Sequence, residues 1–457
     1  VLGWLFVTCT YLIARQFTSQ LLSSSVAIGM VITNAFLNYA QSGCSYIPGL
    51  AFLAMAAYTA IKDPEKSSLL DTLAFAFFLA LSVVFWLPYV LVLPSLAILF
   101  GLRRHKPGAY VCGILQTLAA SVVLISCAYL VALWSADISS LSQATEWLRA
   151  SSHGITHERG VQRAVFGLAR SFVYLGDDGN LFKRFLLRDP FNPVSFLELA
   201  RTSLIRFVIF YMWLAVLLYA IWRCTTNDMR ISALFAIGCV LGFAIYWQGG
   251  DLERYFPVFP LLAAATAATL RHDGKSKRLL ITVHIAFVMM LTVSNIILRT
   301  IELNDLQEKL QNRVRTVSHL LVSGQIQPGD LMILATPHDE LFHVRSNFRD
   351  TQLSVLKLTH PVWVGHRDAP KWRSQLSRQI FGIWQQESQV WVSKRLLLEK
   401  PKASWKWVEG DDPRVSWKDI HSFFASLQYG KVIGDEDGFC LLSRTPTNEH
   451  LLKRWEK

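Results

Sequence analysis

Residues 246–260 read YWQGGDLERYFPVFP, and they place three charged residues in a short break between two apolar stretches. The flanking stretches, 231–249 and 255–270, are close to the roughly 17–25 residues that a helix needs to cross hydrocarbon. Charged side chains are costly within hydrocarbon but can reach water at a helix end. Asp251, Glu253 and Arg254 are therefore expected at a membrane surface.

The composition points to the same class of protein. The chain has 457 residues, of which 52% are hydrophobic and 17% charged, and its mean hydropathy of +0.32 is high for a soluble domain of this size. The formal charge of +12 comes largely from basic residues in short loops and external segments, where anionic headgroups are the simpler partner than nucleic acid. Val1 opens inside an apolar run, so we expect the true N-terminus to be missing.

Apolar stretches predict an α-helical polytopic membrane bundle of about ten transmembrane helices. Pro88 and Pro94, with Trp86 and Tyr89 between the halves, predict a tight turn at an interface. The alternative is one kinked helix with a re-entrant piece, which would invert everything before it. The candidate crossings are 1–15, 21–39, 46–62, 69–85, 88–102, 108–134, 203–222, 231–249, 255–270 and 279–299.

Basic residues in the short loops set the expected orientation. Cytoplasmic loops carry an excess of Lys and Arg, and the basic loops all fall on one side of the ten-crossing arrangement. They are Arg15, Lys62–Lys66, 103–106, Arg223 with Arg230, and 271–278. The opposite face then receives the GGDLER break, the segment 135–202 and the chain after about residue 300.

Four regions follow from this arrangement. Residues 1–134 and 203–299 are the two sets of transmembrane helices, and 135–202 is an external loop with helices at 141–150 and 160–176 that lie on the membrane surface or pack on the bundle. In 300–457, stretches bounded by Pro, Gly and Asp read as strands, alternating with a helical stretch over 372–386. A small external α/β C-terminal domain is therefore expected.

The residues ERYFPVFPLL after a short external turn, and YAQSGCSYIPGLAFLAMAAYTA with Tyr46 opening a helix, carry a resemblance. This layout resembles the GT-C superfamily of membrane glycosyltransferases, of the dolichyl-phosphate-mannose-protein mannosyltransferase and aminoarabinose transferase type. The resemblance implies an inverting transfer of a sugar from a polyprenyl-phosphate carrier to a lipid, glycan or protein acceptor on the external face. In that family the main acidic residue lies in the first external loop, which this chain lacks because it starts at what resembles the second helix.

That departure leaves three interpretations open: a fragment without its catalytic Asp, an inactive chain, or catalysis by another carboxylate. If another carboxylate catalyses the reaction, Asp251 and Glu253 are the candidate catalytic residues. Arg254, as the cation for a carrier phosphate, heads the candidate substrate-binding residues, which also include Tyr255, Tyr46, Gln248, Lys183, Arg184 and Arg188. The simpler alternatives are a solvated loop with an internal Arg254 ion pair, and plain surface charge at 183–188.

No cofactor is expected, because the single DxD spacing, Asp435 and Asp437, reads as a tight turn between strands rather than a metal site. Two other classes of function stay open, a transporter or flippase of lipid-linked sugars and a non-catalytic assembly protein. Transporters place polar residues near the bilayer midplane on broken helices, whereas the charged breaks here lie at helix ends. The chain has no Asn-x-Ser/Thr sequon, which favours a bacterial inner membrane with the C-terminal domain in the periplasm.

Overall fold

The computed structural model forms two compact units, one of residues 1–151, 157–178 and 202–300, the other of 152–156, 179–201 and 301–457. The structure describes residues 2–62, 69–104, 108–150, 159–176, 181–182, 185, 193–271, 276–305, 307–308, 319, 322–327, 329–334, 354–357, 372–399, 417–434 and 438–456.

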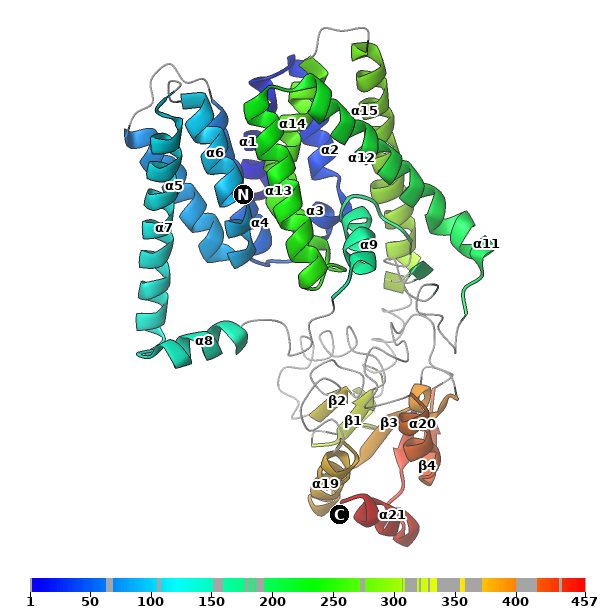
Figure 1. The fold of residues 1–457 in the computed structure, drawn as a ribbon. Helices are drawn as coiled ribbons and strands as arrows, with labels where there is room; N and C mark the ends of the chain where they lie inside the picture. The colour runs from blue at the N-terminus through cyan, green and yellow to red at the C-terminus, as the bar shows by residue number, and fades with distance from the viewer. Residues whose placement is uncertain are drawn as a thin grey trace. The chain divides into compact units, whose positions relative to one another are not determined.

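The first unit is a bundle of helices (Figure 1). Its helices in chain order are α1 Leu2–Arg15, α2 Gln20–Val31, α3 Asn34–Tyr39, α4 Tyr46–Ile61, α5 Leu69–Phe85, η1 Leu87–Val92, α6 Leu93–Arg104, α7 Tyr110–Ser135, α8 Leu141–Ala150, α9 Val161–Phe172, α12 Ile205–Cys224, α13 Asn227–Tyr246, η4 Leu252–Val258, α14 Phe259–Arg271, α15 Lys277–Leu291 and η5 Thr292–Leu298. Two short elements, α11 Phe196–Leu199 and η3 Ala200–Leu204, precede α12.

Five helices of the described chain are long and apolar enough to cross a membrane: Leu87–Arg104, Tyr110–Ser135, Phe196–Cys224, Asn227–Tyr246 and Lys277–Asp305. Four shorter apolar helices, α1, α2, α4 and α5, fall below that length. The architecture is thus that of a multi-pass membrane protein, while the expectation of about ten crossings is met only in part. The last of these helices continues from Lys277 to Asp305.

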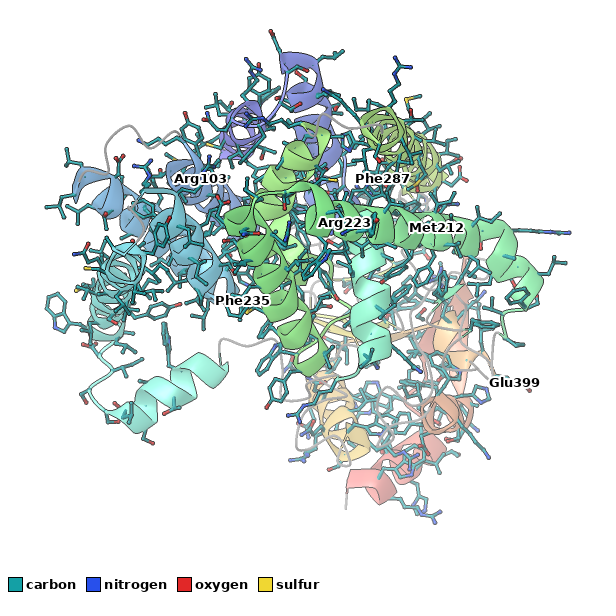
Figure 2. All side chains as sticks on the ribbon, turned by 45° about the horizontal axis from the view of Figure 1, so that its top comes forward. Arg103, Met212, Arg223, Phe235, Phe287 and Glu399 are labelled. Atoms are coloured by element: carbon teal, nitrogen blue, oxygen red, sulfur yellow. The ribbon has the colours of Figure 1, made fainter. Side chains whose placement is uncertain are left out.

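Large apolar side chains stand on the outside of the bundle, as a hydrocarbon environment requires. Met212 on α12 is 65% exposed and Phe235 on α13 is 45% exposed, whereas Phe287 on α15 is buried (Figure 2). On α7 the exposed apolar residues include Val111, Leu115, Val122, Val123, Leu130 and Val131. An exposed apolar surface of this extent on several helices needs a partner other than water.

The predicted turn between α5 and α6 is confirmed. Helix α5 ends at Phe85, Trp86 is extended, and Pro88 lies in the first turn of the 3-10 helix η1. The guanidinium of Arg104, at the end of α6, reaches back to Asp71 in the first turn of α5. The chain therefore reverses at Trp86, and the alternative of one kinked helix is wrong.

Two predicted helices begin or end differently from the expectation. The stretch 21–39 divides into α2 and α3 at Thr33, because Asn295 of η5 donates its amide to the carbonyl of Ile32 at 2.6 Å and removes it from the helical ladder. The stretch 255–270 begins as the 3-10 helix η4 and becomes α-helical only at Phe259. Pro257 has no amide proton for an α-helical hydrogen bond, which accounts for this start.

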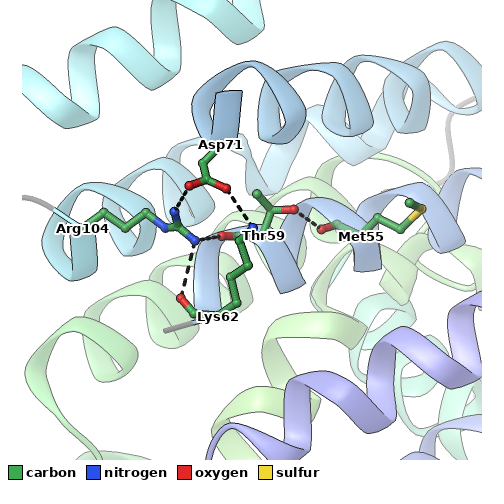
Figure 3. A network of polar contacts seen from close by, with 5 residues as sticks. All are labelled: Met55, Thr59, Lys62, Asp71 and Arg104. Atoms are coloured by element: carbon green, nitrogen blue, oxygen red, sulfur yellow. Dashed lines mark hydrogen bonds and ion pairs between the residues drawn. The ribbon is translucent and has the colours of Figure 1, made fainter. Parts of the chain in front are cut away.

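At one end of the bundle, a polar network joins α4, α5 and α6 (Figure 3). The buried guanidinium of Arg104 donates to the Asp71 carboxylate at 2.7 Å and to the Thr59 carbonyl at 2.9 Å. The Lys62 ammonium lies 2.8 Å from the same carboxylate. Arg103 lies 3.7 Å from Asp228 at the start of α13. Basic residues that the orientation argument assigns to one face thus meet at one end.

Both helices predicted in the segment 135–202 are present, as α8 and α9. Helix α8 runs across the end of α7 (Figure 1). Helix α9 packs on the bundle, where Phe172 is 2% exposed and lies against Phe210, Trp213 and Phe259. Of the two expectations for α9, packing on the bundle is therefore the correct one.

The second unit contains the predicted α/β fold. Its elements are β1 Leu331–Leu334, β2 Ser354–Lys357, α19 Trp372–Gln385, β3 Val390–Ser393, η7 Lys394–Leu397, α20 Trp417–Ala425, β4 Tyr429–Ile433, β5 Phe439–Leu442 and α21 Pro446–Glu456. The described strands form one sheet of order β2-β1-β3-β5-β4, in which β1 is parallel to β2 and β3, and β5 is antiparallel to β3 and β4. A core that includes Ile333, Leu376, Val392, Trp417 and Phe423 joins this sheet to its helices.

Arg104→Ala is expected to lower the free energy of unfolding by about 2–3 kcal/mol, because it leaves the Asp71 carboxylate without its buried partner. Thermal unfolding of the detergent-solubilised protein, followed by tryptophan fluorescence, measures the loss. Arg223→Ala is the matched control, since Arg223 is an exposed arginine at the end of α12. Equal melting temperatures for the two variants would contradict a structural role for the Arg104 network.

Candidate functional site

The charged break of residues 246–260 folds into a turn and the 3-10 helix η4 at one end of the bundle. Gln248 has a positive φ of 47°, which turns the chain sharply after α13. Residues Leu252–Val258 are all buried, so the turn enters the bundle instead of standing in water. Glu253 is 4% exposed and Arg254 is 5% exposed. The expectation of a solvated loop is therefore wrong for these two residues.

Arg254 is held by contacts to a single terminal nitrogen of its guanidinium. Nη2 donates to the Gln248 side-chain oxygen at 2.7 Å and lies 3.5 Å from Asp251 and 4.0 Å from Glu253. Nε is buried and has no hydrogen-bond partner among the described residues. The guanidinium also lies over the Trp86 ring, 5.7 Å from its centroid. The internal ion pair of the alternative interpretation is present, and the Nε donor is left without a partner among the described residues.

Glu253 is a buried carboxyl group with one strong hydrogen bond. The Tyr39 hydroxyl, at the end of α3, donates to Glu253 Oε2 at 2.6 Å. Burial raises the pKa of the Glu253 carboxyl, and the Asp251 carboxylate raises it further, against the lowering effects of the Tyr39 hydrogen bond and of Arg254. The neutral form of Glu253 therefore persists to higher pH than that of a free carboxyl, and in that form the group does not neutralise the Arg254 charge.

Asp251 is the accessible acidic residue of the site. Its side chain is 45% exposed, whereas that of Glu253 is 5% exposed. Only a carboxylate that a second molecule can reach is able to take a proton from it. The two candidate catalytic residues are therefore unequal: Asp251 can meet a substrate, and Glu253 lies behind Arg254.

Helix α9 holds this turn in place through backbone contacts. The Arg170 guanidinium donates to the Gly250 carbonyl at 3.2 Å, and the Ser171 hydroxyl donates to the Leu252 carbonyl at 3.0 Å. Gly167 has no side chain because the Gly249 carbonyl occupies that space, and a Cβ built at 167 would lie 1.8 Å from its oxygen. Close backbone approach of this kind requires glycine.

Four aromatic residues, Tyr39, Tyr46, Trp86 and Tyr89, lie beside Glu253 and Arg254 and are called the aromatic cluster below. Their rings meet edge to face, with centroid distances of 4.9 Å for Tyr39 and Tyr46, 5.2 Å for Tyr46 and Trp86, and 5.1 Å for Trp86 and Tyr89. Tyr89 is fully buried and donates to the Tyr46 carbonyl at 2.6 Å. The cluster joins the ends of α3, α4 and α5 to η4.

The structure brings most of the predicted site residues together. Asp251, Glu253, Arg254 and Gln248 are in mutual contact, and Tyr46 joins them through Tyr39. Tyr255 is fully buried, and its hydroxyl lies 2.6 Å from the Ala164 carbonyl and 2.7 Å from that of Gly249, so it supports the turn. Three further candidates, Lys183, Arg184 and Arg188, lie outside the described residues, as do Asp435 and Asp437.

Sequence reasoning missed two residues of the site. The sequence predicts Tyr39 as the last residue of a membrane helix and Trp86 as part of an interfacial turn. Neither prediction links the residue to the charged break. One feature of the sequence could have linked them to the site. Each lies, like Gln248, where an apolar stretch ends on the predicted external side. Aromatic residues at such ends are common at membrane interfaces, and the sequence alone does not separate the two roles.

Elsewhere, the described chain offers less chemistry. No group of three or more His, Cys, Asp or Glu residues able to hold a metal is found within the described ranges. A small cavity between α12, α14 and α15 is lined mainly by apolar residues, with His284 as the titratable side chain in its wall. The Thr266 and Thr269 hydroxyls in that wall donate to backbone carbonyls of their own helix. The cavity therefore lacks a cluster of polar groups comparable to the one around Arg254.

Comparison with known proteins adds no family to these observations, since neither a protein-family model nor a curated protein matches the chain. The case for a function rests on the residues and their geometry.

Gly167→Ala is expected to lower the free energy of unfolding by about 2 kcal/mol or more, because the added methyl group displaces the Gly249 carbonyl and with it the turn. Gly238→Ala in α13 is the matched control, since a Cβ there meets no atom within 4 Å. That variant should gain roughly 0.5–1 kcal/mol from the better helix propensity of Ala. Thermal unfolding of both variants checks this, and a Gly167→Ala variant as stable as Gly238→Ala would contradict the close backbone packing.

Proposed function

We propose that the chain is an integral membrane glycosyltransferase that moves a sugar from a polyprenyl-phosphate carrier to an acceptor on the external face. The observation that carries the proposal is the buried Arg254 guanidinium, whose Nε has no hydrogen-bond partner among the described residues, next to an accessible carboxylate at the end of an apolar helix bundle. A carrier lipid has its tail in hydrocarbon and its phosphate at the interface, and a cation at a helix end suits that geometry.

The residues divide the reaction between them. Asp251 accepts the proton of the acceptor hydroxyl, and the acceptor oxygen then attacks the anomeric carbon of the donor. The bond from that carbon to the phosphate oxygen breaks, and the electron pair leaves with the polyprenyl phosphate. Arg254 stabilises the negative charge that develops on this leaving group. Attack opposite the leaving group inverts the anomeric centre.

Glu253 acts through Arg254 in this scheme. Burial raises the pKa of the Glu253 carboxyl, so its neutral form, which competes less with a bound phosphate for the guanidinium, persists to higher pH. The Tyr39 hydroxyl and Gln248 fix the positions of Glu253 and Arg254 respectively. A positive group held in advance in a poorly hydrated place needs little reorganisation during the reaction.

We also propose a location in a bacterial inner membrane. The break at residues 246–260 faces the non-cytosolic side, and the basic ends near Arg104 and Arg223 face the cytosol. The α/β unit lies in the periplasm. Support comes from the grouping of Lys62, Arg103 and Arg104 at one end of the bundle and from the excess of basic residues expected in cytoplasmic loops.

Asp251→Asn is expected to lower the turnover of the full chain in proteoliposomes by about 10²–10⁴-fold, because the amide cannot take the acceptor proton. Arg254→Ala should both lower turnover and raise the KM for the carrier-linked sugar, because the guanidinium binds the phosphate and stabilises the charge that develops on it, with partial recovery in Arg254→Lys, since Lys supplies charge without the planar guanidinium. The measurement is transfer of labelled sugar from a panel of polyprenyl-phosphate sugars to lipid, glycan and protein fractions.

Asp137→Asn is the control for the loss of a carboxylate, because Asp137 is exposed directly after α7 and away from Arg254. A wild-type rate in Asp251→Asn would remove Asp251 as the base. Movement of the carrier-linked sugar across the bilayer by the wild-type chain, without transfer to any fraction, would favour the transporter interpretation instead.

Single-cysteine variants are expected to report opposite faces for the two ends of the bundle. Cys44 is exposed in the loop before Tyr46, and a side chain at Gly250 meets no atom within 4 Å, so Cys44 alone and Gly250→Cys are tolerable external reporters. Arg223→Cys reports the other end. An impermeant thiol reagent on intact cells should label the first two at once and the third only after permeabilisation. The reverse pattern would place the site on the cytosolic face.

A further inference from the structure

The accessible part of the aromatic cluster lies directly beside the proposed phosphate site. Tyr89 is fully buried and forms the base, whereas Tyr46 and Trp86 are half-buried residues. Arg254 is over the Trp86 ring at 5.7 Å from its centroid. A group bound by the guanidinium therefore has the indole as its next neighbour.

The rings of the aromatic cluster pack against one another, unlike those of isolated aromatic residues at a membrane interface. The Tyr46 and Tyr89 rings meet Trp86 edge to face, and Tyr89 is close enough to α4 that a Cβ at Gly49 would lie 2.5 Å from its ring. Trp134, at the end of α7, gives the contrast, because it is 81% exposed as a residue of an aromatic belt is. Packing on this scale fixes the orientation of the Trp86 ring before any ligand arrives.

We infer that Trp86 and Tyr46 form a subsite for the sugar ring of a glycosyl phosphate whose phosphate binds Arg254. The inference rests on the proposed function and names the part of the donor that the cluster contacts. A sugar ring has an apolar face of C–H groups with partial positive charge, and an aromatic face carries partial negative charge. Its hydroxyl edge needs hydrogen-bond partners, and the exposed polar residues Gln41 and Ser42 lie in the loop just before Tyr46.

A binding experiment on the purified full chain tests this without turnover. The probes are a hexose 1-phosphate and inorganic phosphate, and the detergent has no sugar headgroup, because a glycoside detergent would compete for the subsite. Wild-type protein should bind hexose 1-phosphate about fivefold more tightly than inorganic phosphate, as an added aromatic contact predicts. Trp86→Leu should abolish that preference, and Trp86→Phe should keep most of it.

Trp134→Leu is the matched control and should leave both affinities unchanged. Arg254→Ala should weaken both probes alike, since they share the phosphate. Equal affinity of the wild-type chain for the two probes, or an equal loss of both in Trp86→Leu, would overturn the sugar subsite and leave Trp86 as support for Arg254. Binding of neither probe would overturn the subsite and would also remove the anion site on which the proposed function rests. Should Trp86→Leu fail to fold, the wild-type preference and Trp86→Phe still decide the matter.

Discussion

Charge within an apolar bundle is confined to helix ends and must be paired there, and this constraint organises the first unit. An unpaired ion in a medium of low dielectric constant is strongly unfavourable. The chain meets the requirement at both ends, with Arg104 against Asp71 at one and Arg254 against Glu253 and Asp251 at the other. These two clusters fix which helix ends lie together, and hence which loops share a face.

The placement of the site also depends on where backbone groups of the turn find their hydrogen bonds. Buried carbonyls need partners, and those of Gly249, Gly250 and Leu252 accept from side chains of Tyr255, Arg170 and Ser171. Helix α9 provides two of these donors, and its Gly167 lets the turn approach. The segment that carries α9 is thus part of the site's support, although none of its described residues contacts Arg254 directly in the interactions above.

The spacing of apolar residues and the positions of Pro, Gly and Asp predicted the elements that depend on local sequence. Helices α8, α9 and α19, the strands of the α/β unit and the reversal at Trp86 all lie where the sequence places them. The division of 21–39 could not be predicted, because it depends on Asn295, which is remote in sequence and reaches the Ile32 carbonyl only in the folded chain. The role of Tyr39 could not be predicted for the same reason, because its hydroxyl meets Glu253, which is remote in sequence, only in the folded chain.

Two buried arginines of the first unit, Arg104 and Arg254, differ in how their surroundings hold them. Arg104 uses both terminal nitrogens, one on Asp71 and one on the Thr59 carbonyl, and so binds its surroundings from two directions. Arg254 uses Nη2 alone for its hydrogen bond and ion pairs among the described residues. Burying an ion pair rarely adds stability compared with well-packed apolar residues. Nε has no partner among the described residues in either arginine, so what sets Arg254 apart is the Asp251 carboxylate beside it, whose side chain is 45% exposed, and this difference supports the proposed anionic ligand.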